Sequence, residues 1–227
     1  AKISQSVCSG ASGCFSMSGR SYIILDGGTN GVIESTANGT SPTFANQLAS
    51  IGVAAFPCSN CEIKNLTIQN IYVHLFDPTD VAVNGALVNA IKLAGSNTTV
   101  HHNILHDAGW AIYQNYGNGD TNVEIHHNEI YNSVKGWTVA GNGAIVASNF
   151  KFYNNHIYNY SNWDTTANTY HFAGIHAFGI SGAAGDAYEI YNNLFEGACG
   201  AHMTGHIYME GNPASKWTSS GTVRIFN

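Results

Sequence analysis

The chain has 227 residues, enough for one domain with a continuous core. Only 10% of them are charged, against about 25% in a typical domain, which argues against long helices with a solvated face. The net charge is −6 without any cluster of Lys or Arg, so nucleic acid and anionic membrane surfaces are unfavoured partners. Membrane insertion is not expected, because no apolar run approaches the ~20 residues of a spanning helix.

The cysteines of the first 61 residues form two close pairs. Cys8 and Cys14 lie six residues apart, and Cys58 and Cys61 form a CxxC sequence. We expect two local disulfides, and hence a secreted, extracellular protein, with Cys199 unpaired and buried. Reduced core thiols are one alternative. A metal site is another, although the spacing of the first pair does not suit a zinc knuckle.

One short phrase recurs along the chain and predicts the fold. It places an apolar residue, a polar pair and a second apolar residue at a constant spacing. The first apolar column contains Ile63, Val100, Ile125, Phe152, Ile190 and Ile225, and the second, five residues on, contains Ile68, Leu105, Ile130, Ile157 and Phe195. An odd spacing cannot keep both columns on one side of a flat strand, so a bend must lie between them. Asn is common in the polar pair and tolerates the left-handed backbone of such a bend.

A second phrase alternates with the first and supplies a third apolar column. Its predicted members are Ile91, Ile112, Ile145, Ile175 and Ile207. Successive first phrases lie 37, 25, 27, 38 and 35 residues apart, as in a solenoid with lateral insertions.

The alternation predicts an all-β, right-handed, single-stranded parallel β-helix of about six to seven turns with lateral loop insertions. Residues 1–227 form one domain, in which 1–20 is a disulfide-bearing cap or first turn. The chain begins at Ala1 rather than Met, as a processed or excerpted protein would, and its last phrase is incomplete, so the coil need not end at Asn227. An antiparallel sandwich is the alternative, but it gives no reason for two alternating phrases or for an Asn ladder. The expected ladder contains Asn103, Asn128, Asn155 and Asn193.

Over residues 20–227 the chain resembles the pectate-lyase-like superfamily of right-handed parallel β-helices. The resemblance lies in the recurring apolar–Asn phrases, such as FKFYNNHI at 150–157, and in YIILDGGTNG near the start. It implies a β-helix and a role on polysaccharides. It identifies no single enzyme family, because neither the paired aspartates of polygalacturonases nor the Arg-rich turn of pectate lyases is present.

An outward row follows the third apolar column and is the predicted carbohydrate-binding surface. Its members are Lys92, Tyr113, Val146, His176 and Tyr208. Aromatic faces pack on sugar rings, while Lys and His bond hydroxyls or carboxylates. Stacking of like side chains between turns, without any ligand, is the alternative interpretation.

The catalytic candidates are His171, His176 and Asp164, which lie close in sequence to this row. The acidic residues are scattered rather than paired, so neither a lyase nor a hydrolase is favoured. The histidine pairs at 101–102 and 126–127 read as turn and ladder residues, so no metal site is expected. No cofactor is expected either, and calcium is not indicated. Glycosylation sequons begin at Asn38, Asn97 and Asn159.

Two functions follow. The first is an extracellular protein that binds or cleaves a polysaccharide through the outward row, with the polysaccharide as its partner. The second is a structural subunit of an extracellular filament, adhesin or spike, formed by end-to-end self-association of β-helices without catalysis.

Overall fold

The protein is all-β. The computed structural model describes residues 1–8, 12–36, 50–71, 88–115, 119–141, 148–161, 171–180, 185–200, 203–211 and 221–227. Within these residues there is no helix. Seventeen strands join in one sheet, β3 (Arg20–Ser21) and β6 (Cys58–Ser59) pair separately, and all pairings between these named strands are parallel.

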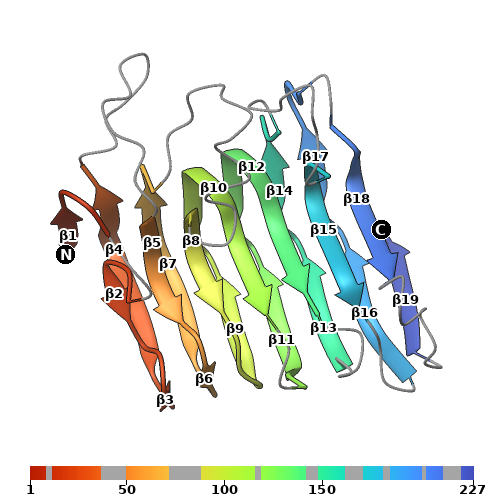
Figure 1. Ribbon diagram of the computed structural model, residues 1–227, viewed down its shortest axis with the longest axis horizontal. Helices are drawn as coiled ribbons and strands as arrows, with labels where there is room; N and C mark the ends of the chain where they lie inside the picture. The colour runs from red at the N-terminus through yellow and green to blue at the C-terminus, as the bar shows by residue number, and fades with distance from the viewer. Residues whose placement is uncertain are drawn as a thin grey trace.

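Strands inside each row pair with the equivalent strands one repeat earlier and one repeat later, so the strands stack along the long axis of the molecule in a solenoid-like arrangement (Figure 1). They fall into three rows. Row one holds the first part of β4 (Ile24–Ser35), the first part of β7 (Glu62–Gln69), β9 (Thr98–His101), β11 (Thr121–His126), β13 (Ser148–Tyr153), β16 (Gly185–Tyr191) and β19 (Gly221–Phe226). Row two holds β1 (Lys2–Gln5), the second parts of β4 and β7, the first parts of β10 (Ile104–Asn115) and β12 (Glu129–Ala140), β14 (His156–Tyr158) and β17 (Leu194–Glu196). Row three holds β2 (Phe15–Ser16), β5 (Ser50–Ala55), β8 (Val88–Leu93), the ends of β10 and β12, β15 (Ala173–Ile180) and β18 (Gly205–Gly211).

The first two apolar columns lie where the spacing predicts. Row one pairs Ile63 with Val100, and the same register continues through the remaining members of the first column. Row two pairs Ile68 with Leu105 and continues likewise through the second column. From Ile63 to Ile190 the first-column side chains are fully buried or nearly so, so stacked apolar columns form the core.

The bend between rows one and two carries the predicted ladder of buried asparagines. The Oδ1 of Asn128 accepts from the backbone N–H and the Nδ2 of Asn103, at 3.0 Å each. The Nδ2 of Asn128 donates to Val100 O at 3.0 Å, and Asn155 and Asn193 repeat the pattern. The ladder therefore satisfies buried backbone groups that the bend takes out of strand pairing.

Left-handed backbone recurs at fixed places in the repeat. The residue just before the ladder asparagine has φ between 52° and 54° at His102, His127, Asn154 and Asn192. A second such place follows row two, where Asn132 has φ 46° and Asn159 has φ 49°, and Gly197 stands next in line with φ 84°. Asn and Gly adopt this conformation at the lowest cost, which explains their abundance.

The third column differs from the prediction in one repeat. Trp137 of β12, and not Ile145, lies between Ile112 and Ile175. Seven residues separate Ile130 from Trp137, as they separate Leu105 from Ile112, so β12 runs into row three without an insertion. The insertion follows β12, and Ile145 lies outside the described residues.

Candidate functional site

The outward row predicted to bind carbohydrate lies in register on row three. Tyr113 pairs with Lys92 on one side and with Thr138 on the other, and His176 then pairs with Thr138 and Tyr208. Thr138 therefore occupies the place predicted for Val146, for the same reason that Trp137 replaces Ile145. Val146 lies outside the described residues.

This row is more enclosed than an outward row suggests. Tyr113 is 9% exposed and His176 is 3% exposed. A second apolar cluster packs here, outside the interior columns. It consists of Trp110, Tyr113, Val134, Ala140 and Phe172, with Phe178 against it.

At the centre of this cluster, three ionisable side chains form a chain of contacts. The Nζ of Lys135, a residue that is 1% exposed, lies 2.6 Å from Nδ1 of His176. The Nε2 of His176 lies 3.3 Å from Oε1 of Glu210, whose side chain is 35% exposed. Because an ammonium group can only donate, Nδ1 accepts and Nε2–H donates to the carboxylate. The three contacting side chains thus run from a buried lysine to a carboxylate at the surface.

Burial strongly lowers the pKa values of the two basic side chains, Lys135 and His176. It lowers the pKa of Lys135 to about 7, although the Glu210 carboxylate opposes the shift. The Lys135 ammonium also lies 4.6 Å from the centre of the Trp110 ring. Burial, followed by the nearby charges of Lys135 and His171, lowers the pKa of His176 to about 3. At neutral pH, therefore, His176 is neutral and Lys135 is divided between its charged and neutral forms.

The structure brings together two of the three catalytic candidates. The rings of His171 and His176 lie 5.8 Å apart, and the Tyr208 ring lies 4.8 Å from His171. The third candidate, Asp164, lies outside the described residues. From the sequence, Lys135 is one of three lysines available to neutralise a uronate, and Glu210 is a scattered carboxylate that only folding could bring near the row, so neither stands out as a site residue. The available signal for Lys135 was a lone lysine in an otherwise apolar strand segment, VKGW.

Two buried polar groups lie close to these ionisable side chains. Within the described residues, the buried Trp110 Nε1–H and Thr138 Oγ1 have no hydrogen-bond partner. An unsatisfied buried donor is costly, so a bound polar molecule that reached these atoms would gain from them. At the other end of the row, Lys92 Nζ lies 4.8 Å from the Phe56 ring centre and 5.9 Å from that of Tyr113. Burial lowers the pKa of Lys92 as well.

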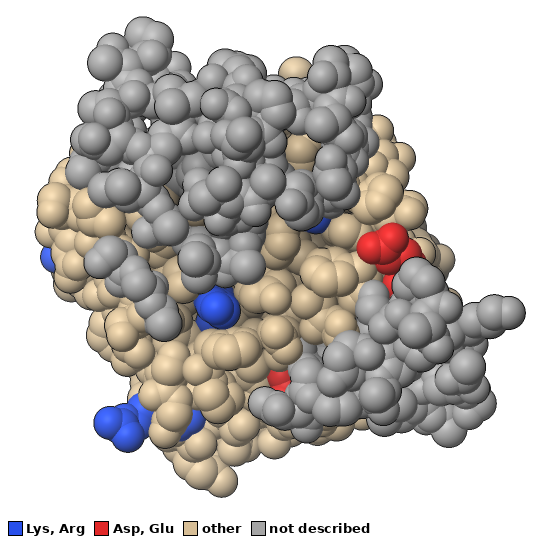
Figure 2. Space-filling model, in the orientation of Figure 1, with Lys and Arg blue, Asp and Glu red and all other residues tan. Residues whose placement is uncertain are grey.

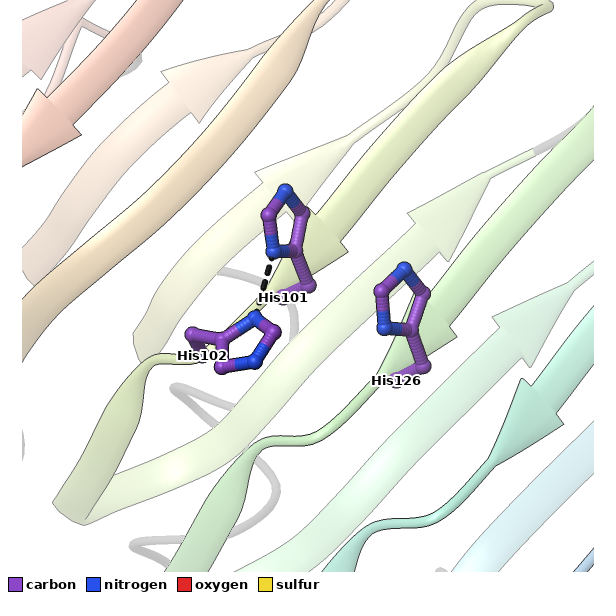
Figure 3. A group of neighbouring side chains, drawn as sticks. All are labelled: His101, His102 and His126. Atoms are coloured by element: carbon purple, nitrogen blue, oxygen red, sulfur yellow. Dashed lines mark hydrogen bonds between the residues drawn. The ribbon is translucent and has the colours of Figure 1, made fainter.

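A second group of side chains lies on row one and the bend that follows it. His101, His102 and His126 bring three imidazoles together, with ligand nitrogens within 4.8 Å of one another (Figure 3). Among the described residues these are the ones whose arrangement could hold a metal ion. Burial first, and then the neighbouring histidines, lower the pKa of His126 to about 4.

The cysteine pairs close as predicted. Disulfides join Cys8 to Cys14 and Cys58 to Cys61, and Cys199 is a half-buried free cysteine rather than a fully buried one. Of the sequons, Asn97 is exposed, and its Nδ2 donates to Asn60 Oδ1 at 3.2 Å. Asn159 is half-buried and accepts from the backbone of Ala198. Asn38 lies outside the described residues.

Among the described residues, the charged side chains visible in Figure 2 lie apart from one another and form no patch of one sign. In the described part of the chain, no helical segment has the length and apolar character needed to cross a bilayer. Comparison of the chain with models of protein families, with curated proteins and with solved structures finds no match.

Proposed function

We propose that the parallel sheet is a right-handed parallel β-helix of the pectate-lyase-like type. Three inward columns in continuous register support this proposal, as do the left-handed bends at fixed places in each repeat. Insertions of variable length between equivalent strands are what such a coil accommodates. The two disulfides support the further proposal that the protein is secreted.

The function we propose is binding and cleavage of an extracellular polysaccharide on row three. The observation that carries this proposal is the Lys135–His176–Glu210 chain beside Trp110, His171 and Tyr208. A buried lysine whose pKa lies near neutrality is typical of acid–base sites, although ion-pair networks also perturb pKa values. The partly exposed groups, Glu210, Tyr208 and His171, are the ones that would contact the sugar chain.

The site favours elimination over hydrolysis. Hydrolysis uses two carboxyl groups that flank the glycosidic bond. Among the described residues, Glu210 is the carboxylate that contacts the Lys135–His176 pair, through His176. In elimination on a uronate, Glu210 would take the proton from the carbon next to the sugar carboxylate. The bond to the leaving oxygen breaks as a carbon–carbon double bond forms, and the Tyr208 hydroxyl gives that oxygen a proton. Lys135 would act through His176, as a positioning residue whose charge influences the Glu210 carboxylate.

The test is an assay on a panel of acidic and neutral polysaccharides that reads both new reducing ends and the ultraviolet absorbance of unsaturated uronates. We expect unsaturated products from an acidic glycan. Glu210→Gln should lower the rate about 100-fold or more, as removal of a general base does. Lys135→Met should instead move the pH profile of the rate, because it removes a group that titrates near neutrality.

Matched controls are Glu124→Gln and Lys151→Met, which neutralise an ion pair of 3.7 Å on row one. Both should leave the rate unchanged. An absence of binding and turnover across the whole panel would overturn the polysaccharide function. Equal losses in control and site variants would overturn the assignment of the site.

A structural subunit is the second candidate. It is favoured by exposed apolar side chains on the outermost strands of row one, where Ile24 is 64% exposed and Ile225 and Phe226 are 56% and 49% exposed. Unpaired strand edges with apolar side chains favour stacking on another molecule. Electron microscopy of the native protein tests this function: regular fibres support it, and dispersed particles contradict it.

A further inference from the structure

Four histidines form two stacked pairs at the bend between rows one and two. In each pair the two Nδ1 atoms face each other, at 2.7 Å between His101 and His102 and at 2.8 Å between His126 and His127. The pairs belong to successive repeats, so the His101 and His126 rings stack at 4.9 Å and the His102 and His127 rings at 5.0 Å. Figure 3 shows His101 and His102 pointing toward one another, with His126 beside them on the next strand. The repeat thus brings several imidazole nitrogens close together at the bend between rows one and two.

A carboxylate holds His101 from the opposite side. Its Nε2 lies 2.8 Å from Oε1 of Glu62, so this nitrogen carries the hydrogen and Nδ1 presents its lone pair to the cluster. Metal-bound histidines almost always donate their other ring N–H to such a carboxylate or carbonyl, which fixes the ring and raises its basicity. The same Glu62 oxygen accepts from Lys64 Nζ at 2.8 Å, so the lysine charge next to His101 in the row is already paired.

From this geometry we propose that His101, His102 and His126 bind a divalent late first-row metal ion, with Cu²⁺ preferred over Ni²⁺ and Zn²⁺. At a metal–nitrogen distance of about 2.0–2.1 Å, adjacent ligands of a square arrangement lie about 2.9 Å apart, and those of a tetrahedron about 3.3 Å. The 2.7 Å between the Nδ1 atoms of His101 and His102 fits the square arrangement better. His126 supplies a third nitrogen from the next repeat, within 4.8 Å of the others, so a small side-chain movement would bring all three nitrogens to metal–ligand distance of one ion.

The site is open to solvent. His102 is exposed and lines a surface pocket of about 290 Å³ together with Asn65, Thr67 and Ile104. Glu62 contacts His101 on the side away from the other imidazoles, and Asp26 lies 4.0 Å from Lys64 in the same row. An aqueous cation can therefore reach His102 from the surface, next to the half-buried His101 and His126.

The competing explanation is a hydrogen bond, in which His102 Nδ1–H donates to His101 Nδ1 and no ion binds. Metal titration of the intact protein distinguishes the two explanations. The titration is followed by calorimetry and by the electron paramagnetic resonance of Cu²⁺. We expect one Cu²⁺ per chain with nitrogen hyperfine structure from the imidazoles. Affinity should decrease from Cu²⁺ to Ni²⁺ and Zn²⁺.

The chain itself supplies replacements that fit the fold. Asn occupies the position of His102 in other repeats, at Asn65 and Asn154, with the same left-handed backbone. Tyr occupies the position of His101 and His126, at Tyr153 and Tyr191. His102→Asn and His126→Tyr should therefore keep the unfolding temperature close to that of the parent and lower Cu²⁺ affinity tenfold or more.

Glu62→Gln keeps all imidazoles and should lower the affinity about tenfold, as loss of such a carboxylate does. His156→Gln is the matched control, since His156 also contacts a carboxylate, Glu196, at 2.7 Å. It should leave Cu²⁺ binding unchanged. Equal Cu²⁺ affinity in His102→Asn and the parent, or a loss in His156→Gln alone, would overturn the proposal.

Discussion

The Nζ of Lys135 lies 2.6 Å from Nδ1 of His176, and both side chains are almost fully buried. Row three brings them together from β12 and β15, two strands that are adjacent in the sheet but separated in the chain by residues 141–172, which include β13 and β14. An isolated charge is strongly disfavoured in such a buried place. Burial therefore lowers the pKa values of both Lys135 and His176. That has consequences for stability as well as for chemistry.

The first prediction concerns pH and Lys135. Its folded-state pKa of about 7 lies below its ordinary 10.5, so between these values the unfolded chain binds the extra proton. Stability therefore rises with pH in this window, by about 3 kcal/mol from pH 7 to pH 9.5. Lys135→Met should remove this rise and be the more stable protein at pH 7. Urea unfolding of both proteins across the window measures the difference, and parallel curves would contradict the prediction.

The second prediction concerns His176 in acid. Because its pKa is about 3 in the folded protein, the ring should stay neutral at pH 5, where an ordinary histidine is charged. Nuclear magnetic resonance titration of the imidazole carbon–proton signals checks this directly. Below pH 6.5 His176 is protonated in the unfolded chain but stays neutral in the folded protein. The free energy of unfolding therefore falls by up to about 1.4 kcal/mol for each unit by which the pH decreases. A midpoint near 6.5 would show that the ring is solvated.

The third prediction concerns the buried asparagine ladder. Asn128→Ala removes the acceptor of the Asn103 N–H and the donor to the Val100 carbonyl. Two buried backbone groups then lack partners, so we expect a loss of about 3–4 kcal/mol in the free energy of unfolding. The control is Asn122→Gly, in an exposed ladder where Asn122 bonds Asn97 and Asn149. Since water replaces those bonds, it should cost less than about 1 kcal/mol.

The sequence predicted the columns and the ladder because both arise within one phrase. Five residues separate Ile125 from Ile130, and the polar pair between them can only be a bend. The third column failed at Trp137 because AIVA at 144–147 imitates its phrase, whereas a connection of seven residues without an insertion gives no local sign of itself.

The candidate sites depend on contacts between repeats, and these are harder to predict. Lys135 contacts His176, and His176 contacts Glu210, only because insertions of different lengths leave three strands in register. For the histidine pairs, the sequence predicts stacking of His101 on His126. It does not encode that the two Nδ1 atoms within each pair turn toward one another.

The last prediction concerns the left-handed position after row two. Asn132 has φ 46°, and the equivalent residues of the next two repeats are Asn159 and Gly197. A branched side chain is crowded in this conformation, so Asn132→Val should cost about 2 kcal/mol or more, whereas Asn132→Gly should cost less than about 1 kcal/mol. Urea unfolding of the two variants, side by side, measures the gap. If valine were tolerated as well as glycine, the bend would not need left-handed backbone, and the physical account of the recurring asparagines would fail.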